Sequence, residues 1–182
     1  MEDLVHLADL IRIRNFVNSS VSRIINHPAE VGHIAEYLMG EIFHIALHDN
    51  ANAKASDGVF REGPLQGQTV NVKFRAARQR KLNLEEFIDP LLHAHFYLAV
   101  QGPRSASRRS KGRELPFLIE ADYLFTSSAL IPQIAKPGHE TIGKSVPTSL
   151  WKAAMIYPEQ VNQALILTPE QRNALALFAP AS

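Results

Sequence analysis

Apolar residues recur at helical spacing through the first 25 positions of the chain. They share intervals of three, four and seven residues: Leu4, Leu7, Ala8, Ile11, Phe16, Val17, Val21, Ile24 and Ile25. This repeat is typical of an amphipathic helix, so it predicts one helix or two short ones over residues 3–25. His27-Pro28 interrupts the pattern, because the residue before a proline avoids helical geometry, and Pro28 suits the first turn of a following helix.

A second helical pattern covers residues 29–47 and has a broad apolar stripe. The stripe holds Val31, Ile34, Ala35, Leu38, Ile42, Ile45 and Ala46. At ~100° per residue the opposite face is polar and collects His33, Tyr37, Glu41, His44 and His48. Glu36 falls on the flank, beside Met39, Phe43 and Leu47. Because an unpaired buried carboxylate is costly, Glu36 has a cation, a metal or a donor nearby, or else it reaches solvent at the edge of the stripe.

Shorter patterns predict strands in the middle of the chain. Two strands are predicted over residues 56–61 and 67–75, and Gly63-Pro64 marks the turn between them. The continuous apolar run from His95 to Val100 indicates an inner strand of a sheet, and residues 115–120 indicate another strand.

Helical patterns return between and after these strands. Residues 76–89 favour a basic helix, residues 121–134 a turn and a short helix, and residues 151–156 a short apolar element. Thr168 suits the N-cap of a last helix, with Pro169 at its first position. The pattern predicts an α/β or α+β domain in which helices flank a small central sheet.

Composition narrows the class of protein. The chain has 182 residues, 46% of them hydrophobic and 20% charged, which is typical of one soluble domain with a sizeable core. No apolar run reaches the ~18 residues of a membrane helix, and the acidic first residues lack the layout of a signal peptide. The chain has no cysteine, which excludes disulfides, thiolate zinc sites and cysteine nucleophiles. We therefore expect a cytoplasmic protein without a membrane segment.

The net charge of +1 conceals a basic segment. Residues 73–113 carry three acids and ten bases, which are Lys73, Arg75, Arg78, Arg80, Lys81, Arg104, Arg108, Arg109, Lys111 and Arg113. A segment of this charge is either a surface for a polyanion such as DNA or a solvated helix followed by a loop. In the first interpretation, residues 104–113 form the loop that contacts the phosphate backbone.

The residues with the clearest chemical potential lie on the first two predicted strands. Asp57 ends one strand just before Gly58, and Asn71 and Lys73 are two apart on the next, so they share a face. A carboxylate, a second oxygen ligand and a lysine on one face suit Mg²⁺-dependent cleavage of phosphodiesters. The alternatives are a turn aspartate before a glycine and a polar strand face in contact with solvent.

Taken together, Glu36 in Gly32-His-Ile-Ala-Glu36, Asp57 in Ser56-Asp57-Gly58, and Asn71-Val72-Lys73 resemble the PD-(D/E)XK nucleases, the restriction-endonuclease-like fold. The resemblance covers residues 29–100, in the order helix, strand with Asp, strand with the (D/E)XK motif, helix, strand. The whole chain is also similar to a group of small bacterial proteins of unknown function placed near this fold. It departs from the family pattern at Asn71, where a carboxylate is expected.

The resemblance implies one domain over residues 1–182, with helices over residues 3–47 and a nuclease-like core over residues 29–125. Asp57, Asn71 and Glu36 would hold Mg²⁺, or Mn²⁺ in its place, and Lys73 would stabilise charge on the phosphate or orient the attacking water. Asn71 supplies oxygen but no charge, which weakens metal binding unless Glu36 or Glu62 compensates. DNA is the implied substrate, and a homodimer is plausible by analogy.

Two other classes of function stay open. Asn71 also fits a catalytically inactive relative that binds nucleic acid or a partner protein. The third hypothesis is a pure interaction protein, in which the basic loop has no role in binding nucleic acid. His44 and His48, four apart with Glu41 nearby, are a candidate zinc pair, and His93 with His95 a candidate phosphate contact. The only tryptophan, Trp151, is expected in the core rather than stacked on a base.

Overall fold

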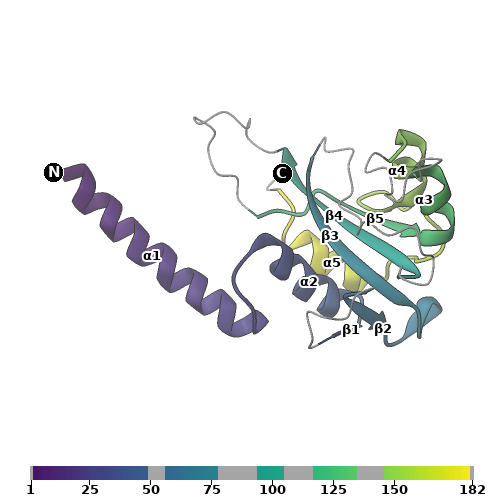
Figure 1. Cartoon of the computed structure of the whole chain (residues 1–182), viewed down its shortest axis with the longest axis horizontal. Helices are drawn as coiled ribbons and strands as arrows, with labels where there is room; N and C mark the ends of the chain where they lie inside the picture. Colours follow the sequence, from purple (N-terminus) through teal and green to yellow (C-terminus); the bar gives the residue numbers. More distant parts are fainter. Residues whose placement is uncertain (1, 49–55, 78–93, 105–116, 135–145, 181–182) are drawn as a thin grey trace, which may run out of the picture.

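A six-stranded mixed sheet forms the centre of the molecule in the computed structural model, and helices cover both of its faces (Figure 1). The structure describes residues 2–48, 56–77, 94–104, 117–134 and 146–180. The helices are α1 (Glu2–Ile25), α2 (Val31–Ile42), α3 (Ser127–Ile134), α4 (Thr148–Ala154) and α5 (Pro169–Ala176), with a 3-10 turn at Gly63–Leu65. The strands are β1 (Ile45–Leu47), β2 (Gly58–Phe60), β3 (Thr69–Ala77), β4 (Phe96–Arg104), β5 (Ala121–Thr126) and β6 (Met155–Tyr157). The predicted α/β class, with helices flanking a central sheet, is confirmed.

The strands lie in the sheet in the order of the chain, β1-β2-β3-β4-β5-β6. Neighbours are antiparallel except β3 and β4, which run parallel from the pair Val70–Phe96 onward. A parallel pair needs a crossover connection, and here that connection runs from Ala77 to Phe96. The two halves of the sheet are therefore antiparallel ribbons that meet along β3 and β4.

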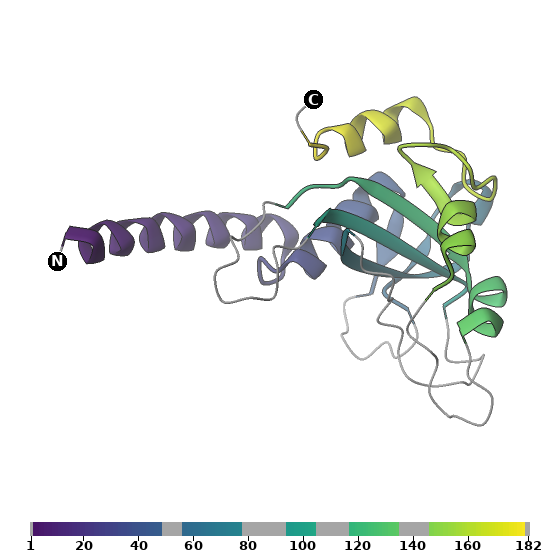
Figure 2. The same cartoon turned by 90° about the horizontal axis from the view of Figure 1, so that it is seen from above.

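Each face of the sheet has its own apolar core, because strand residues alternate between the faces. One core packs α2 and α5 against the sheet through residues such as Met39, Leu98 and Leu175. The other packs α3 and α4 against the sheet through residues such as Leu130 and Trp151. Figure 2 shows α5 on one side of the sheet and the α3–α4 pair toward the other.

The predicted helix over residues 29–47 is wrong in its last third. It ends at Ile42, where the N–H of Phe43 donates to Met39 O at 3.0 Å, and His44 then adopts a φ of 52°. This left-handed residue turns the chain into β1, whose Ile45 packs in the core as a strand residue. Apolar spacing could not reveal this change, because a three-residue strand fits either period.

The predictions for residues 115–134 are also corrected. Residues 117–120 form no strand; the strand is β5, which pairs with β4 from Ala121–Gln101 to Thr126–Phe96, and α3 follows directly. A short apolar run fits a buried strand as well as a helix. The helix predicted over residues 76–89 lies outside the described residues beyond Ala77, which still belongs to β3.

Two terminal predictions are confirmed. The first pattern forms the single helix α1. At α5 the side chain of Thr168 accepts from Gln171 N–H at 3.2 Å, and Gln171 Oε1 accepts from Thr168 N–H at 3.0 Å. This reciprocal pair is a capping box, which fixes where α5 begins. No helix among the described residues combines the length and apolarity that crossing a membrane requires.

Candidate functional site

The strands β2 and β3 part beside the residues that the sequence singled out. They pair only at Gly58–Val70 and Val59–Thr69, whereas β3 continues to Ala77 along β4. Beyond Val70, the β2 side of β3 has no strand partner among the described residues. We call this region, defined by Asp57, Asn71, Val72 and Lys73, the β2–β3 opening.

Asp57 is held at the β2–β3 opening by hydrogen bonds of its side chain and its backbone. Its Oδ2 accepts from the backbone N–H of Val72 at 2.6 Å, in place of the missing ladder partner. Its own N–H donates to Val70 O, and its carbonyl accepts from His48 N–H, both at 2.9 Å. A backbone N–H that donates to a carboxylate orients it, so the Asp57 carboxylate has a defined position.

Gly58 allows β1 to approach β2 beside Asp57. A Cβ atom built at Gly58 would lie 2.5 Å from the carbonyl oxygen of Ala46 and 2.6 Å from a methyl carbon of Ile45. Real Cβ atoms do not come so close, so only glycine fits here. At Asp57-Gly58, a carboxylate oriented by Val72 N–H is therefore followed directly by a position where β1 comes so close to β2 that only glycine fits.

Asn71, Lys73 and Arg75 alternate with core residues along β3 and share the α3–α4 face of the sheet. Asn71 is 6% exposed, and its Oδ1 has no hydrogen-bond partner among the described residues. Lys73 is half-buried, opposite Ala99 of β4. Buried polar atoms are normally paired, so the Asn71 carbonyl oxygen is a candidate ligand atom.

Glu36 reaches the same region from α2. It is half-buried, and burial is the main cause that raises its pKa, followed by the neighbouring Asp57 carboxylate. His33, Lys73 and His27 act in the opposite direction and lower the pKa of Glu36. Two carboxylates that oppose each other's ionisation beside a lysine are an arrangement found at catalytic sites, although structural ion networks produce it as well. Asp57 and Lys73 therefore both act electrostatically on Glu36, although Lys73 lies on the α3–α4 face of the sheet and α2 packs on the other face.

The donor atoms at the β2–β3 opening suit a hard divalent cation. Glu36, Asp57 and Asn71 offer oxygen atoms, and Mg²⁺ is commonly held by one or two carboxylates with water completing its shell. Among the described residues, no group of three or more His, Cys, Asp or Glu side chains could hold a metal ion. The third ligand would thus be the Asn71 amide, and the set fits one cation rather than two.

Arg75, predicted as a nucleic-acid contact, is buried instead. It is 7% exposed, and its guanidinium carbon lies 3.8 Å from the centre of the Trp151 ring. Burial lowers the pKa of Arg75, and Tyr123 acts in the opposite direction. The role predicted for Arg75 is corrected because its side chain lies under α4, while the core position expected for Trp151 is confirmed.

The rest of the predicted basic surface falls outside the side chains that the structure describes. Arg104 ends β4, but its side chain is not described. The other residues lie outside the described ranges: Arg78, Arg80, Lys81, Arg108, Arg109, Lys111 and Arg113. The polyanion surface therefore stays a prediction.

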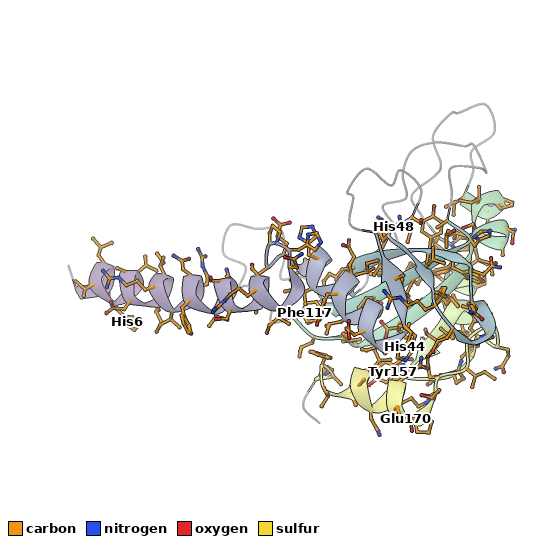
Figure 3. The ribbon with its side chains drawn as sticks, turned by 90° about the horizontal axis from the view of Figure 1, so that it is seen from below. His6, His44, His48, Phe117, Tyr157 and Glu170 are labelled. Atoms are coloured by element: carbon orange, nitrogen blue, oxygen red, sulfur yellow. The ribbon has the colours of Figure 1, made fainter. Side chains whose placement is uncertain are left out.

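The zinc hypothesis assumed that His44 and His48 share a helix face, and they do not. They lie at the two ends of β1 (Figure 3), and His44 Nε2 instead lies 3.4 Å from Glu62 Oε1 at the surface. His48 Nε2 lies 3.2 Å from Ser56 Oγ. Glu62 is exposed and is not among the groups that shift the pKa of Glu36, so nothing places it in the site.

His95 has a structural role between β3 and β4. Its Nδ1 accepts from Thr69 N–H at 3.1 Å, and its own N–H donates to Thr69 Oγ1 at 2.9 Å. These bonds join the starts of the two parallel strands. His93 lies outside the described residues.

Asp122, which is fully buried in β5, was not among the residues singled out from the sequence. It is 0% exposed, and neither carboxylate oxygen has a hydrogen-bond partner among the described residues. Burial raises its pKa to about 8. A lone aspartate inside the apolar run Ala121–Phe125 is the only signal that could have found it.

No protein-family model matches this chain, and no curated protein sequence matches it. The resemblance to PD-(D/E)XK nucleases therefore stays a prediction from the residues.

Proposed function

We propose that this chain is a restriction-endonuclease-like protein of the PD-(D/E)XK type that hydrolyses phosphodiester bonds of DNA in the cytoplasm with Mg²⁺. The observation that carries the proposal is that Asp57, bonded to Val72 N–H of β3, and Lys73 of β3 both shift the pKa of Glu36 on α2. The buried and unpaired Asn71 oxygen on the same strand as Lys73 adds the second ligand position.

The order of the elements supports the same class. A helix with Glu36 precedes an antiparallel ribbon, Asp57 precedes β2, and the Asn71-Val72-Lys73 motif lies on β3. The next described strand, β4, runs parallel to β3, so a crossover connects the two. The described elements follow the order that the resemblance implies for residues 29–100, with β1 added, while the helix implied between β3 and β4 lies outside the described residues.

Each residue has a role that its position supports. Asp57 is oriented by Val72 N–H, and it would hold the cation together with Asn71 Oδ1 and Glu36. A Mg²⁺ ion held by these residues would supply Lewis-acid polarisation of the phosphate and a more acidic bound water. Lys73, whose charge already acts on Glu36, stabilises the negative charge that develops on the phosphate oxygens during attack.

Binding without cleavage is the second candidate function, and Asn71 favours it. The residue brings no charge, and the described residues offer two carboxylates rather than three. In this case the Asp57 carboxylate has a structural role, in which it accepts from Val72 N–H. DNA would be retained in a salt-dependent and metal-independent way.

The test compares wild type, Asp57→Asn and Lys152→Met on supercoiled plasmid, linear duplex and single-stranded DNA. Each protein is assayed with Mg²⁺, with Mn²⁺ and with EDTA. Asp57→Asn keeps an oxygen that can accept from Val72 N–H but removes the charge, so it separates chemistry from folding. Lys152 is exposed on α4, so Lys152→Met is the control that removes a charge outside the candidate site.

Metal-dependent cutting that Asp57→Asn loses and Lys152→Met keeps would support the nuclease. Cutting that persists in Asp57→Asn would remove Asp57 from the site. No cutting with any metal, together with retention of DNA that weakens as salt rises, would favour the second candidate.

A further inference from the structure

The helix α1 leaves the body of the molecule and exposes most of its apolar side chains. Figures 1 and 2 show it extending beyond the sheet and the other helices. Its 24 residues span about 36 Å, and Ile25 is the only one buried among residues 3–25. Its exposed large apolar residues are Leu4, Val5, Leu7, Leu10, Ile11, Ile13, Phe16, Val17 and Ile24. Monomers rarely leave so much apolar surface in water, and isolated helices rich in Val and Ile are marginal.

One side of α1 repeats with the seven-residue period of paired helices. In paired helices, the residues at the first and fourth positions of each repeat face the partner helix. Residues at the fifth position lie beside them and widen the contact. We call these residues the α1 stripe: Leu7, Leu10, Ile11, Arg14, Val17, Asn18, Val21 and Ile24. All but Arg14 and Asn18 are apolar.

The polar contacts within α1 lie on the side away from the stripe. Arg12 Nη1 donates to Asp9 Oδ1 at 2.6 Å, and Arg23 Nη2 donates to Ser20 Oγ at 3.4 Å. At ~100° per residue these four residues lie roughly opposite Ile11. The helix thus has a water side, where charges already pair, and an apolar side, the stripe.

We propose that α1 pairs, antiparallel, with α1 of a second copy of this chain. An antiparallel pair that sets Arg14 opposite Asn18 of the second copy also sets Ile11 opposite Val21. The two polar positions then meet each other, and the apolar pair Ile11–Val21 occurs once on each side of the centre of the interface. The interface is the same patch on both copies, as two-fold symmetry requires.

The charges of α1 select the antiparallel direction. The first ten residues carry acids and the later ones arginines: Glu2, Asp3 and Asp9, then Arg12, Arg14 and Arg23. An antiparallel pair sets each acidic half beside the basic half of the other copy. A parallel pair would instead place Arg14 against Arg14 inside the stripe, which like charges disfavour.

The same charges argue against a lipid surface as the occupant. Helices that lie on anionic membranes are rich in Lys and Arg on the polar side. The acids and arginines of α1 balance, three against three. A second copy therefore fits the helix better than a membrane does.

The first experiment measures the mass of the full chain by sedimentation at a series of concentrations. Wild type is compared with Leu10→Glu/Ile11→Glu on the stripe and with Val5→Glu/Phe16→Glu on the opposite side. Both variants replace two exposed apolar residues, so they are matched. The stripe variant should raise the dimer dissociation constant on the order of 100-fold or more, because each copy would bury two charges. The control should stay near wild type.

A second experiment reads the direction of pairing. Because the chain has no cysteine, single cysteine variants cross-link only through the introduced thiol. Under mild oxidation, Ile11→Cys mixed with Val21→Cys should give a disulfide-linked dimer, whereas Ile11→Cys alone should not. Both readouts are independent of nuclease activity.

The outcomes divide clearly. A wild type that stays monomeric up to about 100 µM, or a dimer that the stripe variant leaves intact, would overturn the proposal. Ile11→Cys that links to itself would overturn the antiparallel direction. Retention of the wild type, but not of the stripe variant, on vesicles of phosphatidylcholine and phosphatidylglycerol would assign α1 to a lipid surface instead.

Discussion

The described residues hold half-buried carboxyl groups at the β2–β3 opening and a fully buried one in the core, and the two places differ in what surrounds these groups. At the opening, the Asp57 carboxylate raises the pKa of Glu36 and Lys73 lowers it, and Asp57 accepts a backbone N–H. In the core under α2 and α5, Asp122 has no hydrogen-bond partner among the described residues, and only burial shifts its pKa.

The difference shows that a shifted pKa is not by itself the mark of a functional site. Burial alone is enough to raise the pKa of Asp122 to about 8. The opening is a candidate site because carboxylates, a lysine and the oriented Asp57 Oδ2 atom lie in the same region. The partial burial of Glu36 alone would not make it one. Four changes test this contrast, from the largest expected effect to the smallest.

Asp122→Asn should change how stability depends on pH. The pKa of Asp122 is raised from its ordinary value of 3.8 to about 8, so between these values the folded chain holds a proton that the unfolded chain has released. Wild-type stability should therefore fall as pH rises, and this one group contributes about 1.4 kcal/mol per pH unit. Urea unfolding at pH 5 and pH 7 should show this slope reduced in Asp122→Asn, by nearly 3 kcal/mol over the interval.

Leu124→Val is the matched control for this change, because Leu124 is a buried neighbour in β5 without a titratable group. It should lower stability equally at both pH values. An unchanged slope in Asp122→Asn would mean that Asp122 ionises in the folded chain much as it does in water.

Lys73→Met should reduce cleavage on the order of 100-fold, because it removes the charge that stabilises the attacked phosphate. It should also raise the pKa of Glu36 further, since Lys73 lowers that pKa. Single-turnover cleavage gives the first effect, and carboxyl NMR signals give the second. Lys152→Met is the control, and equal cleavage by both variants would exclude a role for Lys73.

Asp57→Ala should lower the free energy of unfolding by about 1–3 kcal/mol, because Val72 N–H loses its partner at 2.6 Å. Asp57→Asn should lower it less, since an amide oxygen can still accept. Urea unfolding of both variants measures the difference. Equal losses of stability would mean that the carboxylate charge, not the hydrogen bond, stabilises the opening.

Asn71→Asp should tighten Mg²⁺ or Mn²⁺ binding by about tenfold, because charge count sets the affinity of an oxygen site. Titration calorimetry of the variant and wild type checks this expectation. Asn71→Ser, which removes the amide without adding charge, is the control and should weaken binding. If Asn71→Asp unfolds the chain and the metal does not restore it, residue 71 is not a ligand.

The α/β class followed from the alternation of elements along the chain, and the structure confirms it. Glu36, Asp57 and Lys73 were singled out because each departs from the apolar pattern around it, and their role stays a prediction. The end of α2 could not be predicted, since it depends on the left-handed conformation of His44 and on the pairing of β1 with β2. Such pairing is a tertiary contact that local spacing does not record.

Arg75 and Asp122 show a second limit. The burial of either residue could not be predicted from the sequence, because a charged residue is normally exposed. Arg75 also lies in a segment with many other basic residues. Its burial results from the β3 face that α4 and Trp151 cover. Only the packing of distant elements decides which charged residues leave the surface.

The chain-ordered sheet has a consequence for how the molecule folds. Every ladder of the described sheet joins strands that follow one another in the order β1 to β6, and the longest connection runs from Thr126 of β5 to Met155 of β6. Loop closure costs entropy that grows with length, so we expect the β1–β3 ribbon, which has the shortest connections, to form first. All four residues of the candidate site fall between positions 36 and 73, within the first ribbon and its helix. Its parts are therefore neighbours along the chain as well as in space, and their contacts are among the least costly to form during folding.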